Sequence, residues 1–340
     1  MRLTKLFDSD LHNVHHAAFW LAVFSLLSAF LGAFRDRLLA GHFGASRELD
    51  IYYSAFRVPD FIYTFMLLFT ASTALIPVLL ESSQDEKKDI NNLIGSLISA
   101  FTIAVVVLSI IAFFLMPYFS NIAFPGFSSD EKQSAIILSR ILLFSPLLLG
   151  LSNIFASVTQ SFGRFFVYGL SPIFYNLGII FGIFMFFKPW GLPGLAAGVV
   201  LGAILHMVTQ ALLLWRLKLT PRWNKFLFEG VKEVAVFSLP RTIGLQINQI
   251  LSIVLTGIAS TLSVGSIAIF NLASNLQFIP ITVIGLSYSI AAFPALAEYS
   301  LKKAKEHFEA HFSAAFRHIL FWALPFSFFK TGVHSILLQE

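Results

Sequence analysis

Long stretches without any charged residue are the feature that most limits how this chain can fold. Between Arg241 and Glu298 there is no Asp, Glu, Lys or Arg, and similar apolar runs recur along most of the sequence. A helix needs about 20 mostly apolar residues to cross a bilayer, and a barrel strand instead shows alternating polarity. The runs here are unbroken, so the sequence predicts an all-α, polytopic membrane protein.

The charge-free intervals also locate the spans. With 57% hydrophobic residues, 12% charged residues and 39 Phe, the chain is far more apolar than a soluble domain. The interval 242–297 is long enough for two helices, and the segment LSVGS (Leu262–Ser266) marks a turn between them. We expect about nine transmembrane helices, near residues 15–34, 51–80, 93–116, 135–159, 165–187, 193–215, 234–258, 266–297 and 313–329.

The distribution of basic residues predicts the orientation. The polar start of the chain has no cleavable signal peptide, so we expect the first span to be retained. Most Lys and Arg residues fall in loops on the N-terminal side, which places the N-terminus in the cytoplasm. The net charge of +5 is then a topology signal, and it does not indicate a nucleic-acid partner. Without Cys, the chain can form no disulfide.

Two similar segments suggest an internal repeat. STALIPVLLES (Ser72–Ser82) ends the second expected span, and SIAAFPALAEY (Ser289–Tyr299) ends the eighth. An even number of spans between them makes the repeats parallel, a pattern of transporters built from two similar lobes. We therefore expect a complete six-helix lobe over residues 1–230. The segment 231–340 is expected to form part of a second, pseudo-symmetric lobe of three helices.

Several segments together resemble a known family. They are FRDRLLAGHFGASRELDIYYSAFRVPDF (Phe34–Phe61), VTQSFGRFFVYGLSPIFYNLGII (Val158–Ile180), and the stretch from GLQINQ to AAFPALAE (Gly244–Glu298). In order and spacing, these motifs are similar to the MviN-type lipid II flippases of the multidrug/oligosaccharidyl-lipid/polysaccharide exporter superfamily. That family has fourteen helices, so the resemblance implies a C-terminally truncated chain.

The resemblance implies a non-enzymatic flippase in the bacterial inner (plasma) membrane. Its substrate would be lipid II, a lipid-linked saccharide diphosphate of peptidoglycan synthesis, carried by alternating access from the inner to the outer leaflet. A diphosphate cannot cross about 30 Å of hydrocarbon unaided, so the carrier needs a polar, cationic cavity while the lipid tail stays among membrane lipids. Arg suits this role because its planar fork binds phosphate oxygens and stays charged. We expect a monomeric protein without metal or other cofactor.

The family's functional positions match this chain in part. The resemblance implies cavity roles for Arg35 and Asp36, for Asp50, and for Arg57, which stands where the family has Lys. Other charged residues of the family are replaced by neutral ones: the Arg of the first span by Ala29, the Arg pair and Glu of the second span by Tyr63, Thr64 and Leu68, and the Arg of the eighth span by Asn275. Asn275 remains a candidate cavity residue. Arg241, directly after Pro240, is a cation that the family does not usually place there, and it is a candidate to replace the lost charge.

Arg57 and Asp60 are the most informative charges. They lie three residues apart inside an apolar span, on one face of a helix, where ionisable groups are costly unless they are paired or face water. Two interpretations stay open: the two side chains pair with each other, or both face a cavity, where Asp50 and Asp60 would hold Arg57 in place. Pro59 between them removes a backbone hydrogen bond and can bend the helix.

Other features allow two interpretations each. The histidines His12, His15 and His16 suit either a metal or an amphipathic helix start. His206 and Gln210, one turn apart, suit either interhelical hydrogen bonds or a proton relay. No nucleophile–base pair or phosphate-binding loop indicates an enzyme. The alternatives to a lipid II flippase are an exporter of another polyprenyl-linked oligosaccharide or of a small molecule, and a non-transporting membrane scaffold of the same fold.

Overall fold

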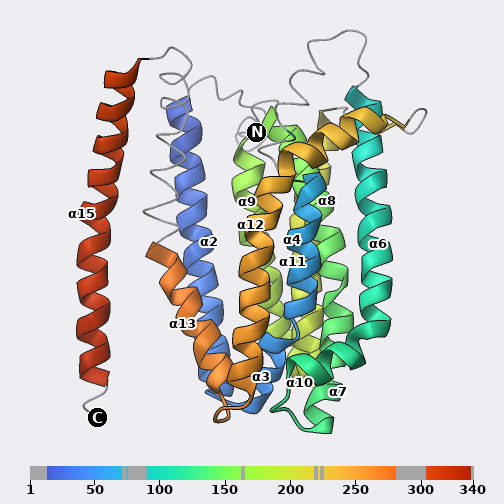
Figure 1. Ribbon diagram of the computed structural model, residues 1–340, viewed down its shortest axis with the longest axis vertical. Helices are drawn as coiled ribbons and strands as arrows, with labels where there is room; N and C mark the ends of the chain where they lie inside the picture. Colours follow the sequence, from blue (N-terminus) through green and yellow to red (C-terminus); the bar gives the residue numbers. More distant parts are fainter. Residues whose placement is uncertain are drawn as a thin grey trace. The chain divides into compact units, whose positions relative to one another are not determined.

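The computed structural model describes residues 14–70, 75, 90–161, 165–217, 221–222, 226–280 and 304–337. These residues form helices and turns, as Figure 1 shows, which confirms the all-α prediction. The helices are α2 (Val14–Phe43), α3 (Arg47–Ser54), α4 (Arg57–Thr70), α6 (Ile90–Ala123), α7 (Ser129–Leu142), α8 (Phe144–Ser161), α9 (Phe165–Phe181), the π-helical turn η1 (Gly182–Phe186), α10 (Phe187–Trp190), α11 (Leu192–Arg216), α12 (Phe228–Ser260), α13 (Ser266–Pro280) and α15 (Lys305–Leu337).

Each expected span overlaps one or more of these helices, and most of 71–80 and all of 281–297 lie outside the described residues. Five described segments are long and apolar enough to cross a membrane, and they are Asn91–Ala123, Ser129–Gln160, Phe166–Trp190, Leu192–Arg216 and Phe228–Ser260. The turn expected at Leu262–Ser266 is present, since α12 ends at Ser260 and α13 begins at Ser266. The total number of spans stays a prediction, and the two repeat segments lie largely outside the described residues.

Chain contacts divide the protein into two compact units, Met1–Leu272 and Ala273–Glu340. The first unit contains every helix from α2 to α12 and the start of α13. Within it, α11 packs against α9 and α8, α2 against α9, and α4 against both α8 and α12. The division into six-helix and three-helix lobes at residue 230 stays a prediction.

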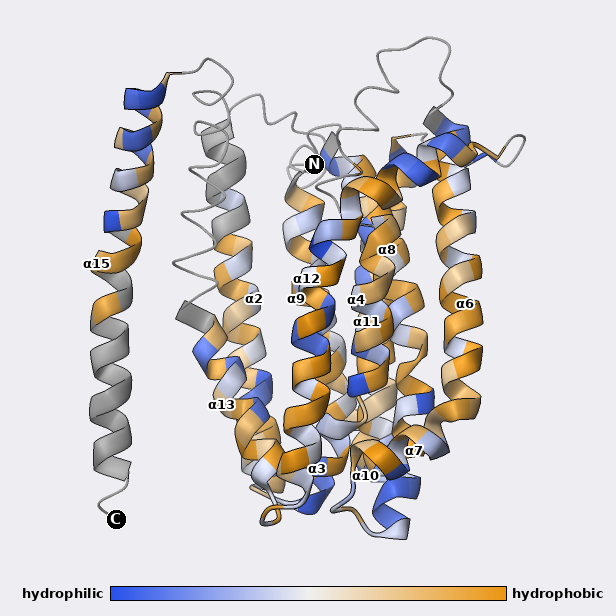
Figure 2. Ribbon diagram, in the orientation of Figure 1, coloured by the Kyte–Doolittle hydropathy of each residue, from blue (hydrophilic) through white to orange (hydrophobic). Residues whose placement is uncertain are grey.

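Two buried apolar clusters hold the first unit together. One contains Leu49 of α3, Phe124 of the turn after α6, Leu138 of α7 and Val199 of α11. The other contains Met66 of α4, Phe101 of α6 and Ile154 of α8 among others. The outward face of α6 is also apolar, and Figure 2 shows hydrophobic residues along its whole length. Exposed apolar surface of this extent is typical of a helix that faces lipid.

Glycines let α9 and the following π-helical turn η1 approach α11 closely. Gly178 and Gly182 face Gly198 and Gly202, and a Cβ atom added at any of the four would collide with the backbone of the opposite helix. Small residues at such crossings are the usual means of tight helix packing in membranes. This crossing fixes the wall of the bundle that carries Asn176 on α9 and His206 on α11.

Candidate functional site

The first spanning helix continues past the predicted end at residue 34. Because α2 runs to Phe43, Arg35 and Asp36 lie about two turns inside a helix rather than at its end. Their side chains are largely buried and form an ion pair, with Arg35 Nη2 2.8 Å from Asp36 Oδ1. Arg35 also donates from Nη1 to Asn176 Oδ1 at 3.1 Å. Asn176 therefore holds the guanidinium in one orientation. The sequence favours interhelical hydrogen bonding for Asn176, but it does not identify Arg35 as the partner.

Asp50 lies at one end of the bundle, here named the α3 end. It is formed by α3, the α6–α7 turn (residues 124–128) and the α12–α13 turn (residues 261–265), at the bottom of Figure 1. Asp50 is 1% exposed, and its carboxylate accepts hydrogen bonds from the backbone N–H groups of Gly265 and Ala268, at 2.7 and 2.8 Å. Carboxylates bind helix N-termini favourably because free N–H groups and the helix dipole converge there. Asp50 thus caps α13 from another helix.

Close backbone packing reinforces the α3 end. Gly265 has φ of +90° and leaves no room for a Cβ atom, which would meet Ala45. Gly126 lies against the carbonyl of Ser260 and donates its N–H to the Ser260 hydroxyl at 3.2 Å. Arg47 completes the contact, since its Nε lies 3.1 Å from Glu131 Oε1. The α12–α13 turn (residues 261–265) therefore packs closely against α3 and the α6–α7 turn.

Arg57 begins α4, directly after a break in the helix at Ala55 and Phe56. Its Nη2 donates to Asn271 Oδ1 on α13 at 2.6 Å, and its Nε is buried without a partner among the described residues. Of the two open interpretations, a direct ion pair with Asp60 is absent from the described residues in this conformation, although the charge of Asp60 acts on Arg57.

A second contact joins α4 to α12. Gln246 donates from Nε2 to the Phe61 carbonyl and to the Thr64 hydroxyl, both at 3.1 Å. Thr64 stands where the resemblance implies a cation, so a neutral hydrogen bond occupies that position here. Together with Arg57 and Asp50, Gln246 links the α3–α4 segment to the part of the chain after residue 230.

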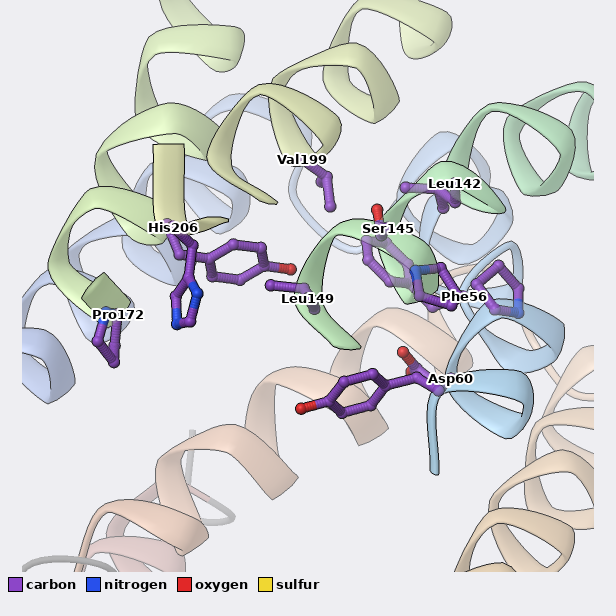
Figure 3. Close-up of a pocket in the computed structure, with 12 residues that line it drawn as sticks. Phe56, Asp60, Leu142, Ser145, Leu149, Pro172, Val199 and His206 are labelled. Atoms are coloured by element: carbon purple, nitrogen blue, oxygen red, sulfur yellow. The ribbon is translucent and has the colours of Figure 1, made fainter. Parts of the chain in front are cut away.

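A cavity of about 270 Å³ lies between α4, α8, α9 and α11. Figure 3 shows Asp60 of α4, Ser145 of α8 and His206 of α11 on its walls. Its lining residues are Phe56, Pro59, Asp60, Tyr63, Leu142, Ser145, Pro146, Leu149, Pro172, Tyr175, Val199 and His206. The cavity combines one carboxylate, one imidazole and three hydroxyls with an otherwise apolar surface, so it can hold water or a small polar group.

The wall residues also form hydrogen bonds between helices. Ser152 Oγ lies 2.7 Å from His206 Nδ1, and Asn153 donates to the Tyr63 hydroxyl at 2.9 Å. Gln210 donates to Ser171 Oγ at 2.8 Å. The prediction of interhelical hydrogen bonds for His206 and Gln210 is therefore confirmed, and His206 in addition borders a cavity.

The remaining predicted site residues lie elsewhere. Arg241 is exposed on α12, and its charge interacts with Tyr63 and Tyr168. Asn275 is half-buried on α13, in the second unit. The side chains of His12, His15 and His16 lie outside the part of the chain that the structure describes. Among the residues that the structure describes, no group of three or more His, Cys, Asp or Glu residues is arranged to hold a metal ion.

A larger hollow of about 520 Å³ lies between α4, α6 and α12. Its walls are almost entirely carbon, from residues such as Phe65, Ile111, Leu115 and Ile253. Such a surface suits hydrocarbon rather than a diphosphate or a sugar. It is therefore a lipid-compatible groove and no candidate for the polar site.

Comparison with known proteins places these features in context. A sequence profile described as lipid II flippase MurJ matches residues 39–336. A probable lipid II flippase MurJ of Buchnera aphidicola subsp. Acyrthosiphon pisum is 27% identical over 328 residues, covering 94% of this chain and 62% of the relative. The lipid II flippase MurJ of Burkholderia cenocepacia is 24% identical over 336 residues, covering 96% and 64%. The chain thus spans less than two thirds of these relatives.

Solved structures share the fold. One, titled lipid II flippase MurJ in an inward closed conformation, matches with a TM-score of 0.67 and 24% identity, over 90% of this chain and 63% of that one. An inward-facing multidrug resistance transporter of the MATE family and MOP superfamily matches with a TM-score of 0.66 and 16% identity, over 90% and 68%. These likenesses establish a polytopic transporter fold.

Proposed function

Because this chain belongs to the lipid II flippase MurJ family, we propose that it moves a lipid-linked peptidoglycan precursor from the inner to the outer leaflet of the bacterial inner membrane. The cargo would be a polyprenyl diphosphate that carries sugars. No bond in it needs to be broken, so the protein acts as a transporter and not as an enzyme. In this proposal the N-terminus is cytoplasmic, which puts the α3 end on the outer side.

The observation that carries the proposal is the set of polar contacts across residue 230. Asp50 caps α13, Arg57 binds Asn271, and Gln246 binds α4. Each contact is short, polar and surrounded by apolar residues, so it can exchange for water when the two sides separate. Alternating access requires a contact of this kind at the end that is closed, and its loss at the end that opens.

Two cations of the first six helices supply the positive charge. Arg35 and Arg57 are both largely buried, and each is oriented by an asparagine. A guanidinium held in this way is already positioned to bind phosphate oxygens when a cavity opens beside it. Asp36 keeps Arg35 from being an unpaired charge in the closed state.

One observation favours a second candidate, the export of another polyprenyl-linked oligosaccharide. Tyr63 and Thr64 stand where the resemblance implies cations, and both make neutral hydrogen bonds, to Asn153 and Gln246. Fewer cations and more hydroxyl groups suit a cargo with more sugar and less charge.

Depletion of the protein in its own cells separates the candidates. A lipid II flippase requires that lipid II accumulates in the inner leaflet, where an impermeant reagent added outside cannot reach it. Accumulation of a different lipid-linked saccharide would support the second candidate instead. An unchanged distribution of all such lipids would contradict both and leave a non-transporting scaffold.

A further inference from the structure

Asp60 is a carboxylate that lines the cavity between α4, α8, α9 and α11. Among the described residues its side chain makes neither a hydrogen bond nor an ion pair, and the charge that acts on it is that of Arg57. An isolated carboxylate in such surroundings is costly when ionised, and it is stabilised by water or by taking up a proton. The site must therefore supply one or the other.

Ser145 gives independent support for an occupant. Its side chain is 7% exposed, its hydroxyl has no hydrogen-bond partner among the described residues, and it lines the same cavity (Figure 3). Buried hydroxyls are nearly always satisfied, so an orphaned one next to a cavity indicates water or a ligand there. A volume of about 270 Å³ is ample for several water molecules.

We propose that this cavity is a proton-binding site, in which Asp60 takes up and releases a proton through water held by Ser145, Tyr63, Tyr175 and His206. The donor set favours a proton over a metal cation. Hard cations are held by cages of about six or more oxygen ligands. The side chains here offer one carboxylate and three hydroxyls, and one of these hydroxyls already accepts a hydrogen bond from Asn153.

The titratable surroundings of Asp60 are few. Neither α6 nor α8, which both pack against α4, contains an Asp, Glu, His, Lys or Arg residue. On α7, Glu131 pairs with Arg47, and Arg140 stacks on Phe113. Among the described residues, the groups that remain near the cavity are Arg57 and Tyr63 on α4, Tyr175 on α9 and His206 on α11. Arg35 on α2 acts on Tyr175, and Tyr168 on α9 and Arg241 on α12 act on Tyr63.

The proton would control the α3 end through Arg57. The negative charge of Asp60 acts on Arg57, one turn before it, which holds Asn271 of α13. When Asp60 is neutral, the guanidinium stays buried without that charge, so the closed state loses stability relative to one in which Arg57 reaches water. Proton uptake therefore favours opening of the α3 end, and by linkage opening favours proton uptake. This consequence rests on the proposed alternating access, whereas proton binding itself does not.

The absence of Cys from the chain makes opening measurable. Ser260 is 1% exposed, and its hydroxyl accepts from Gly126 at the α3 end, so a Ser260→Cys thiol is protected from a maleimide until this end opens. Between about pH 8 and about pH 5.5, we expect the labelling rate, corrected for the intrinsic reactivity of an exposed control thiol, to rise about fivefold, the low end of typical coupling factors. Asp60→Asn should label at the acidic rate at every pH.

Control variants decide which group takes the proton. Asp60→Glu should keep the response, because it keeps the carboxyl group. Glu48→Gln, which changes an exposed carboxylate outside the cavity, should keep it as well. A response that survives Asp60→Asn, or one that is lost only in His206→Gln, would overturn the proposal. Replacement of sodium by choline at fixed pH should change nothing, and a sodium-dependent rate would identify a metal cation instead.

Infrared difference spectroscopy tests proton binding without any conformational change or cargo. Wild-type protein in vesicles should show a protonated carboxyl band on acidification, and this band should be missing in Asp60→Asn. A band that remains in Asp60→Asn refutes the site. A band that is lost without any pH effect on labelling keeps the proton site but rejects its coupling to the α3 end, and neither result depends on whether lipid II is the cargo.

Discussion

The carboxylate of Asp50 accepts the backbone N–H of Gly265 at 2.7 Å, although the two residues lie 215 positions apart. The same carboxylate accepts from Ala268, so a single side chain of α3 caps the N-terminus of α13. The carboxylate of Asp50 therefore holds two distant parts of the chain together. Its negative charge also interacts favourably with the dipole of α13.

Replacing Asp50 by Asn should weaken the α3 end. The amide keeps the shape, but it loses the charge and can present only one oxygen to the two N–H donors, so we expect a loss of about 2 kcal/mol in unfolding free energy. Maleimide labelling of Ser260→Cys should rise in parallel. Glu48→Gln, an exposed carboxylate on the same helix, is the matched control and should leave labelling unchanged.

Arg57 should tolerate Lys better than Gln. Lysine keeps the charge and one donor for Asn271, whereas Gln loses the charge, so Arg57→Lys should retain partial activity and Arg57→Gln should lose transport while it still folds. The measurement is complementation in cells depleted of the protein, together with protein level. Arg140→Gln, which removes an Arg stacked on Phe113, should complement normally. Full activity of Arg57→Gln would give Arg57 a structural role only.

Asn176→Ala should release the Arg35 side chain. Asn176 accepts from Arg35 and donates to the Ser28 hydroxyl and the Pro172 carbonyl, so its loss leaves several groups unsatisfied, at a cost of about 2 kcal/mol. Transport should fall more than protein level does, because Arg35 loses its orientation. Arg37→Ala, an exposed neighbour of the ion pair, should be nearly neutral in both measurements.

Gly202→Ala should destabilise the protein by about 1–3 kcal/mol in thermal unfolding, because the new methyl group meets the Tyr175 carbonyl on α9. The same change at Gly244 on α12 meets no atom within 4 Å. There, Ala should be neutral or stabilising by up to about 1 kcal/mol, since it lowers the cost of forming the helix. Equal effects at the two sites would show that the α9–α11 crossing is looser than described.

A reporter enzyme fused after Arg222 should be active in the cytoplasm, and one fused after Ser129 should lie outside. The positive-inside rule predicts this orientation from the basic residues on the N-terminal side. The opposite pattern would invert the whole topology and would put the α3 end in the cytoplasm.

Element positions were accessible from the sequence because the physics that sets them is local. A run of apolar residues must be helical in a bilayer, and α6 and α11 accordingly match their predicted spans within a few residues at most ends. The end of α2 could not be predicted from the sequence. Arg35 and Asp36 look like a polar helix end, and only the packing around Asn176 shows that they are buried within the helix.

Partners of buried charges were not accessible in the same way. Helix spacing favours Asp60 as the partner of Arg57, yet Asn271, 214 residues away, takes the guanidinium. Likewise, Asp50 stands out as a charge in the sequence, but nothing in the sequence identifies two backbone N–H groups of α13 as its partners. Such choices depend on tertiary packing, which single-sequence patterns do not encode.

The glycine contact between α9 and α11 also has a mechanical consequence. Where two backbones touch with no side chain between them, there is no rotamer change to absorb a small slip, and a slip by one residue, about 1.5 Å, would drive a larger side chain into the opposite backbone. We therefore expect α9 and α11 to move together as one rigid unit. Any rocking of the protein must then be taken up at joints elsewhere, such as the break between α3 and α4 at Ala55 and Phe56.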